Sequence, residues 1–425
     1  MNMKKKLIIV CVVLGLTQVL IGQVSLTPDM YRERVLAYSQ VLKQAHESKI
    51  AASAAKGVAR TGYLPKLDFS AQGTLDLKEL DKWDGAVGEY RNHTYYGQLT
   101  LSQPLYMGGA VKAQNKVASE ELLLAELSEE LSMDQIVYQA EAVYWQAAAT
   151  QALLDAAEEY RRIVEEQHRV ISDRFEDGLI SKTDLLMIST RQKEAELQYI
   201  TARKNHTLSM YRLHTLMGED PEKKMEELAG MDEQMDLPAF LELDEVLGRR
   251  AEFKSAQANI RKSEALRSSV LSKFNPQLSM FVTGGWGSAS PNLGLDPAFA
   301  AITGLNLSFP VFHWGERRQT DKQYKAYVTA QKLQESLAID QIKEELAGAR
   351  AKIQESMNQV RTARENIGLA EENLDLVTFT YNEGKASIVD VLSAQLSWTQ
   401  AKSNVVNAWL GHKLALAEYK KVVSY

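Results

Sequence analysis

The sequence predicts a mainly α fold with a small β part, built as two copies of one long helical unit. Its nine prolines leave two tracts of nearly equal length, 105–220 and 311–425, without proline, and a long proline-free tract favours uninterrupted helix. Short segments in which polar and apolar residues alternate precede both tracts, as expected for strands. The 425 residues are therefore not expected to divide into several ordinary globular domains.

Residues 1–22 have the composition of a secretory signal peptide. Three lysines precede the apolar stretch Leu7–Ile21, which is too short to cross a bilayer as a helix. Nothing amphipathic favours the alternative, a buried first helix. We expect an exported chain without cysteine after cleavage, because Cys11 lies within the apolar stretch. Such a chain depends on packing or assembly, and not on disulfides, for its stability.

The rest of the chain contains one unit twice. Four pairs of residues are each separated by 206 positions: Pro104 and Pro310, Gly178 and Gly384, Ser181 and Ser387, and Asp184 and Asp390. This period is too long for a solenoid and indicates duplication of a large unit. We expect a first repeat at 23–217, a connector at 218–240 and a second repeat at 241–425, each repeat with a helix, two strands and a long helical hairpin.

Each repeat contains two tracts with alternating polar and apolar residues. The expected strands are Leu67–Leu77, Tyr95–Ser102, Gln277–Trp286 and Leu305–Val311. Two-faced tracts of roughly ten residues have the length and pattern of tilted strands that cross a bilayer. The alternative is four strands of a soluble sandwich, but the sequence offers no further strands for a second sheet.

A very long helix is expected after the second strand of each repeat. The segments from Gly109 to Gly178 and from Gly315 to Gly384 contain no proline, and at 1.5 Å per residue each helix would be about 100 Å long. Apolar residues recur within them in steps of three and four, a pattern that specifies supercoiled helix packing. An ordinary dimeric coiled coil would explain this repeat but not the strands.

The turn after each long helix carries the most specific local pattern. Gly178 and Gly384 suit the left-handed conformation that ends a helix. Ser181 and Ser387 suit the cap of the next helix, each with an aspartate three positions further on. On chemistry alone the two aspartates are helix-start residues. Returning helices are then expected at Lys182–Met217 and Ile388–Val423.

Four strands per chain cannot close a barrel. An open sheet edge in lipid would leave unpaired backbone groups that cost several kcal/mol each, so copies of the chain must associate. Two, three or four copies would give eight, twelve or sixteen strands. Because both strand pairs join long helices at one end only, the helices would project together from one side of the membrane and pack into a tube.

Over almost its whole mature length the chain resembles the TolC-type outer-membrane efflux proteins, the outer membrane factor family. The shared marks are the signal peptide, the 206-residue duplication, the Leu-Ser-x-Pro strand ends followed by Gly108 and Gly315, and the Tyr-x-x-Gly-x-x-Ser-x-x-Asp-Val-Leu-x-Ala-Gln turn at Tyr381–Gln395. The resemblance implies a homotrimer with a twelve-stranded transmembrane β-barrel among outer-membrane lipid and an α-barrel in the periplasm. It also implies passive export of substrates that an inner-membrane transporter delivers through a periplasmic adaptor (membrane fusion protein), in tripartite efflux or type I secretion.

The resemblance also assigns a gate at the periplasmic end. Asp390 matches an aspartate that faces the lumen of the closed channel in the family, where three copies would form an anionic ring. Ser393 stands where the best-known member has a second acidic ring, and Ala386 stands where it has a constraining arginine. The residues that partner this arginine there are retained as Thr183, Asp184 and Tyr381.

Because of Ala386 and Ser393, we expect other contacts than those of the best-known member to hold this gate closed. Lys385 and Lys182 are the candidates that the sequence offers for the missing arginine. The exposed turns are the expected contacts of the adaptor, and their residues are Gly178, Ser181, Gly384 and Ser387. The alternative is that these turns are only solvated ends.

No enzyme, metal or cofactor site is expected. The seven histidines lack metal-ligand spacing with carboxylates, and the chain contains no Gly-x-Ser-x-Gly motif. His206 and His214 lie eight residues apart on one expected helix and are expected to form a surface pair. A mean hydropathy of −0.28 excludes a polytopic helical membrane protein.

Nucleic acid is not an expected partner, because the net charge of −6 comes without a basic patch.

The alternative to a channel is a structural periplasmic coiled-coil protein without a transport role. A passive duct takes its selectivity from its pump, so drugs, metal ions, peptides and proteins all stay open as substrates.

Overall fold

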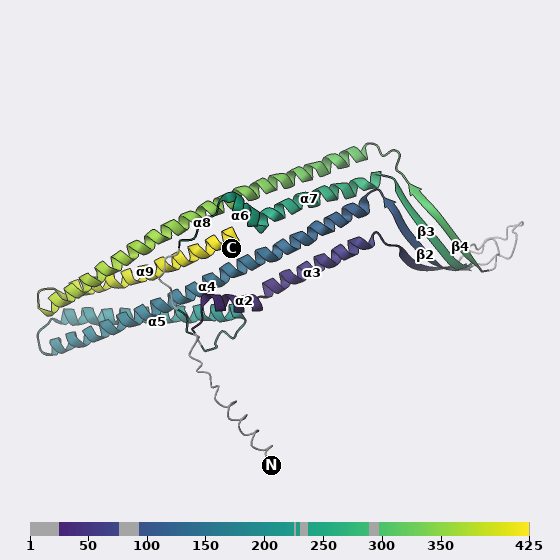
Figure 1. The fold of residues 1–425 in the computed structure, drawn as a ribbon. Helices are drawn as coiled ribbons and strands as arrows, with labels where there is room; N and C mark the ends of the chain where they lie inside the picture. The colour runs from purple at the N-terminus through teal and green to yellow at the C-terminus, as the bar shows by residue number, and fades with distance from the viewer. Residues whose placement is uncertain (1–24, 76–92, 225–226, 230–236, 289–296, 425) are drawn as a thin grey trace, which may run out of the picture. The chain divides into compact units, whose positions relative to one another are not determined.

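The computed structural model describes residues 25–75, 93–224, 227–229, 237–288 and 297–424 (Figure 1). The expected signal peptide and the last two residues of the first expected strand lie outside this part of the chain. Among the described residues, no helix combines the length and the apolar character needed to cross a membrane.

Both repeats run through the same order of elements, and the fold is mainly helical with one small sheet. The first contains α2 (Pro28–Tyr38), α3 (Gln40–Thr61), β1 (Lys66–Leu75), β2 (His93–Met107), α4 (Ala110–Glu176) and α5 (Lys182–Met217). The second contains α6 (Leu243–Arg249), α7 (Ala251–Leu271), the 3₁₀ turn η1 (Ser272–Phe274), β3 (Gln277–Gly287), β4 (Ala298–Ser308), α8 (Glu316–Asn382) and α9 (Ile388–Val423).

The chain forms two compact units, and both repeats contribute to each of them. We call the first the hairpin unit; it comprises the described residues within Met1–Leu42, Ser132–Arg249 and Ile342–Tyr425. The second, the sheet unit, comprises Lys43–Leu131 and Arg250–Gln341. Division by packing therefore differs from division by repeats, and the repeat boundaries stay a prediction.

The sheet unit contains one antiparallel sheet in the order β1-β2-β3-β4. Phe69 lies opposite Leu99, Leu99 opposite Gly284, and Gly284 opposite Ala301, so these residues share one face. That face is apolar and includes Leu67, Phe69, Leu99, Leu101, Val282, Trp286, Leu305 and Leu307. The other face is largely polar and includes Asp68, Ser70, Gln98, Thr100, Thr283 and Asn306.

The fourth strand differs from its prediction. It runs Ala298–Ser308 and not Leu305–Val311, because β3 pairs with it over its full length, from Gly287 opposite Ala298 to Gln277 opposite Ser308. Alanines dominate its first half, so no polar and apolar alternation marks it in the sequence. The strand ends at Ser308, which lies opposite Gln277, the first residue of β3.

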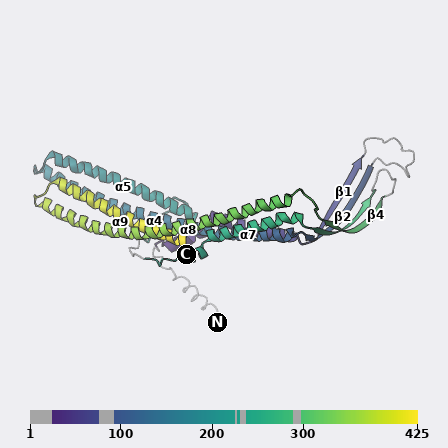
Figure 2. The same ribbon diagram turned by 90° about the horizontal axis from the view of Figure 1, so that it is seen from above.

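In the hairpin unit α4 contacts both α5 and α9, and α8 contacts α9. Figure 2 shows α5 and α8 on opposite sides of the unit. The core near the turns is one apolar cluster to which all four helices contribute: Tyr160, Val164, Ile171, Ile188, Ala195, Ala370, Ile388, Val391, Leu392, Trp398 and Ala401. On α8 the buried positions include Leu346, Ala349, Ile353, Ser356 and Val360. These follow the predicted steps of three and four, so the heptad pattern is confirmed for this helix.

Candidate functional site

The two turns that join the long helices to the returning helices have the same backbone geometry. Gly178 and Gly384 adopt φ angles of +73° and +72°. The N–H of Leu179 donates to the carbonyl of Arg174 and that of Lys385 to the carbonyl of Thr380, both at 2.9 Å. This arrangement ends a helix on a left-handed residue, as predicted.

A capping box begins each returning helix. The N–H of Asp184 donates to Ser181 Oγ at 3.2 Å, and the N–H of Ser181 donates back to Asp184 Oδ2 at 3.3 Å. In the second repeat the corresponding distances are 3.3 Å and 2.9 Å for Asp390 and Ser387. Both aspartates therefore serve first as helix-start residues, and this prediction is confirmed.

The carboxylate of Asp390 is exposed in the first turn of α9. Hydrogen bonds from the hydroxyl of Ser387, at 2.7 Å, and from its backbone N–H lower the pKa of Asp390 below its ordinary value. The carboxylate is therefore negative throughout the neutral range. That this carboxylate faces the lumen of a channel stays a prediction, because it concerns an assembly of several chains.

The other predicted gate residues occupy different environments. Thr183 and Ser393 are exposed, whereas Tyr381 is half-buried and packs against the apolar cluster of the four helices. Lys385 lies 3.9 Å from Glu383, within its own turn. The arrangement therefore gives Lys385 a local partner and does not support it as a lock between hairpins.

Contacts between the two hairpins were not predicted from the sequence. The ring of Tyr381 lies 5.5 Å from the guanidinium carbon of Arg174. The buried side chain of Gln395 donates to Gln167 at 2.5 Å, and Lys402 pairs with Glu159. Gln167 occupies an otherwise apolar heptad position, and a polar residue there is a known signal of a specific pairing.

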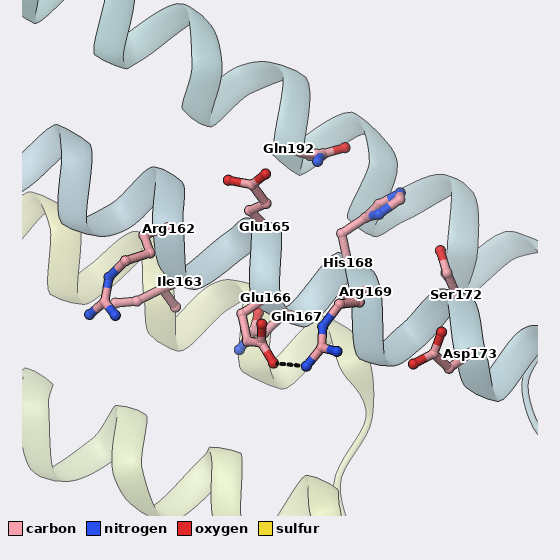
Figure 3. Close-up of a pocket in the computed structure, with 10 residues that line it drawn as sticks. All are labelled: Arg162, Ile163, Glu165, Glu166, Gln167, His168, Arg169, Ser172, Asp173 and Gln192. Carbon is pink, nitrogen blue, oxygen red and sulfur yellow. Dashed lines mark hydrogen bonds and ion pairs between the residues drawn. The ribbon is translucent and has the colours of Figure 1, made fainter.

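A hollow of about 830 Å³ lies on the surface of α4, with Gln192 of α5 on its rim (Figure 3). Arg169 in this hollow pairs with Glu166 at 2.5 Å, and His168 hydrogen-bonds Ser189 at 3.0 Å. Charges of both signs line it, so it presents neither an anion site nor a cation site. Within the described ranges, no group of His, Cys, Asp and Glu could hold a metal ion.

The predicted surface pair of histidines is wrong. His206 and His214 are buried, with 7% and 0% of their surface exposed, because this end of α5 packs on α4. There Thr150 of α4 and Ser209 of α5 share a 2.6 Å hydrogen bond. Burial lowers the pKa of His206 below its ordinary value, and nearby Asp155 acts in the opposite direction.

Comparison with known proteins agrees with this geometry. A family model described as "Outer membrane efflux protein" matches residues 32–219 and 243–418. Nodulation protein T of Rhizobium leguminosarum bv. trifolii is 23% identical over 396 residues, which cover 89% of this chain and 82% of the relative. The fold is similar to the CmeC outer membrane channel of Campylobacter jejuni, with a TM-score of 0.82, 19% identity and coverage of 93% and 85% of the two chains. It is also similar to VceC of Vibrio cholerae, with a TM-score of 0.79, 18% identity and coverage of 93% and 95%.

Proposed function

Because the chain belongs to the outer membrane efflux protein family, we propose that three copies of it form a channel-tunnel for passive export. The protein is an outer-membrane protein of an efflux family with a large periplasmic part. In the proposal, an inner-membrane transporter and a periplasmic adaptor deliver the substrate, and the chain itself is not an enzyme. The observation that carries the proposal is the two-faced, four-stranded sheet.

The sheet supports assembly through its edges. Within the described residues, β1 and β4 each pair on one side only, and an open edge in a bilayer is costly. One face is apolar and the other largely polar, as in a wall between lipid and a water-filled lumen. Joining β4 of one copy to β1 of the next would satisfy both edges, and three copies would give a twelve-stranded barrel.

The hairpin unit supports the same ring. On α5 the exposed apolar residues include Leu186, Leu197, Ile200 and Leu208. On α8 they include Leu369, Leu376 and Phe379. These helices form opposite flanks of the unit (Figure 2), so α5 of one copy and α8 of the next would bury their stripes against each other. Stripes on opposite flanks give a head-to-tail contact, the type of interface from which rings of subunits are built.

The gate in this proposal is the carboxylate of Asp390 at the start of α9. Three copies would bring three negative charges to the narrow end of the tube, where they would attract and retain cations. Thr183, Asp184, Tyr381 and Ser393 would surround the constriction. The turns at Gly178 and Gly384 would be the adaptor contacts, since their shared geometry lets one kind of partner surface bind both.

The test begins with the assembled protein. Outer-membrane fractions should contain heat-modifiable trimers, and purified trimers should conduct ions in planar bilayers. Asp390→Ala and Asp390→Asn should both weaken block of the current by divalent cations, because both remove the charge. Ser387→Ala is the matched control, since it removes the hydroxyl that caps the same helix and leaves the charge of Asp390 in place. A soluble periplasmic dimer would support the structural coiled coil instead, and unchanged cation block in both Asp390 variants would refute the gate.

A further inference from the structure

Four aromatic rings of the sheet reach across to a glycine of the neighbouring strand. The four pairs are Phe69 with Gly97, Tyr96 with Gly285, Phe281 with Gly304, and Phe299 with Gly284. A ring in this position covers backbone that has no side chain of its own, which is a known way to stabilise a sheet. All four rings can have this structural role.

The four pairs are divided between the two faces of the sheet. Phe69 and Phe299 belong to the apolar face, where aromatic rings are expected next to lipid. Tyr96 and Phe281 belong to the other face, whose side chains are mostly those of Ser, Thr, Gln and Asn. Two aromatic rings on a wall of this kind need a reason other than contact with lipid.

The two rings of the polar face lie along the sheet and do not stand out from it. A Cβ at Gly304 would lie 2.8 Å from Cζ of Phe281, and a Cβ at Gly285 would lie 2.7 Å from Cζ of Tyr96. Cζ is the ring carbon farthest from the backbone, so each side chain extends sideways over the next strand. Both residues are half-buried. One side of each ring therefore rests on the glycine backbone, and the other side is directed away from the sheet.

Between the two rings the wall carries hydroxyl groups. Thr100 lies opposite Thr283 in a cross-strand row between the rings, and their hydroxyls share a 3.2 Å hydrogen bond. Charges of both signs occur on the same face, since Asp68 and Lys66 both belong to it. Charge therefore does not distinguish this stretch from a plain polar wall, whereas the pair of rings does.

We propose that Tyr96 and Phe281 form a stacking track for aromatic substrates on the inner wall of the barrel. The proposal rests on the channel function proposed above and names a substrate class for it: small molecules that carry aromatic rings together with polar or cationic groups. Such rings stack on an exposed ring, and a cation next to a ring face is attracted by its quadrupole. A molecule that leaves one ring meets the second ring further along the same wall.

An alternative role for the two rings is structural only. Phe69 provides the comparison, because it covers Gly97 on the apolar face, where a Cβ would lie 3.8 Å from Cε2 of Phe69. A structural role affects the assembly of the sheet from either face. A stacking track affects the passage of aromatic molecules, and it does so from the polar face alone.

The experiment measures block of the ion current through single trimers of the full chain in planar bilayers. The probes are tetraphenylphosphonium and tetrabutylammonium, two cations of equal charge of which the first is aromatic. Tyr96→Leu and Phe281→Leu should each raise the tetraphenylphosphonium concentration that gives half block about three- to fivefold. Neither variant should change block by tetrabutylammonium. Tyr96→Phe, which keeps the ring, and Phe69→Leu, the matched control, should both behave as the wild type.

Three results would overturn the stacking track. They are unchanged block by tetraphenylphosphonium in both leucine variants of the polar face, equal shifts for the two probes, or an equal shift in Phe69→Leu. The heat-modifiable trimer fraction shows whether each variant assembles.

A variant that adds a ring keeps the question open to test if the leucine variants do not assemble. Ile302 is 62% exposed and lies opposite Thr283, in the row between the two rings. Ile302→Phe should lower the tetraphenylphosphonium concentration that gives half block, and an unchanged value would refute the track. A wild-type chain that forms no channel refutes the proposed function itself, whereas conducting trimers with unaltered block refute only the track.

Discussion

At the scale of single residues, the buried histidine of α5 makes stability depend on pH. Burial lowers the pKa of His206 in the folded protein, while the unfolded chain keeps an ordinary value near 6.5. When the pH falls through 6.5, the unfolded chain binds the proton first, so the free energy of unfolding decreases until the lower folded pKa is passed.

His206→Gln should remove this contribution. The variant is expected to lose less thermal stability than the wild type between pH 7.5 and pH 5.5, measured as the melting temperature of the purified protein in detergent. Titration of Asp390 does not affect this comparison of melting temperatures, because its pKa is lowered and its carboxylate stays charged from pH 7.5 to pH 5.5. Equal losses in the two proteins would contradict the assignment.

The residues that were predicted well are those whose partners are close in sequence. Ser181 and Ser387 each cap a helix through an aspartate three positions away, and that spacing is visible in the sequence. The burial of His206 depends on α4, and the contact of Arg174 depends on α8. Such partners are set by tertiary packing, and no local pattern indicates them.

At the scale of elements, two glycines associated with α8 should respond to alanine with opposite signs. Gly384 has φ +72°, which strains any residue with a Cβ, whereas Gly348 lies within the helix; a Cβ would meet nothing within 4 Å at either position. Gly384→Ala should destabilise the protein by about 1 kcal/mol and Gly348→Ala should stabilise it by about 0.5–1 kcal/mol. Thermal melts of the two variants beside the wild type give the comparison, and shifts of the same sign would contradict it.

The helices were more predictable than the strands. The returning helices α5 and α9 begin and end at the predicted residues. Glycine turns and serine caps mark their starts in the sequence. The strand β4 was displaced in the prediction, since its first half is defined only by pairing with β3. A strand end depends on its neighbour, and a helix end depends on its own residues.

At the scale of the whole molecule, the exposed stripe on α8 should be an interface between copies. Leu376→Glu places a charge in the stripe and should reduce the heat-modifiable trimer fraction several-fold, because an unpaired charge is costly in an apolar contact. Gln359→Glu, exposed on the same helix ten residues before Leu369, is the control and should assemble as the wild type does. Normal assembly of Leu376→Glu, measured by electrophoresis with and without heating, would show that this face stays in water.

The two long helices also constrain how the gene can change. Both α4 and α8 have 67 residues, and one residue inserted in either would turn everything beyond it by about 100° and advance it by about 1.5 Å. Such an insertion would remove the heptad positions of that hairpin from their partners in the other. Changes in length are then tolerable only as whole heptads, or as matched changes in both halves of the duplication. The lengths of the two helical hairpins are thus inherited as a pair, and a single unbalanced insertion should be selected against even where no side chain of known role is altered.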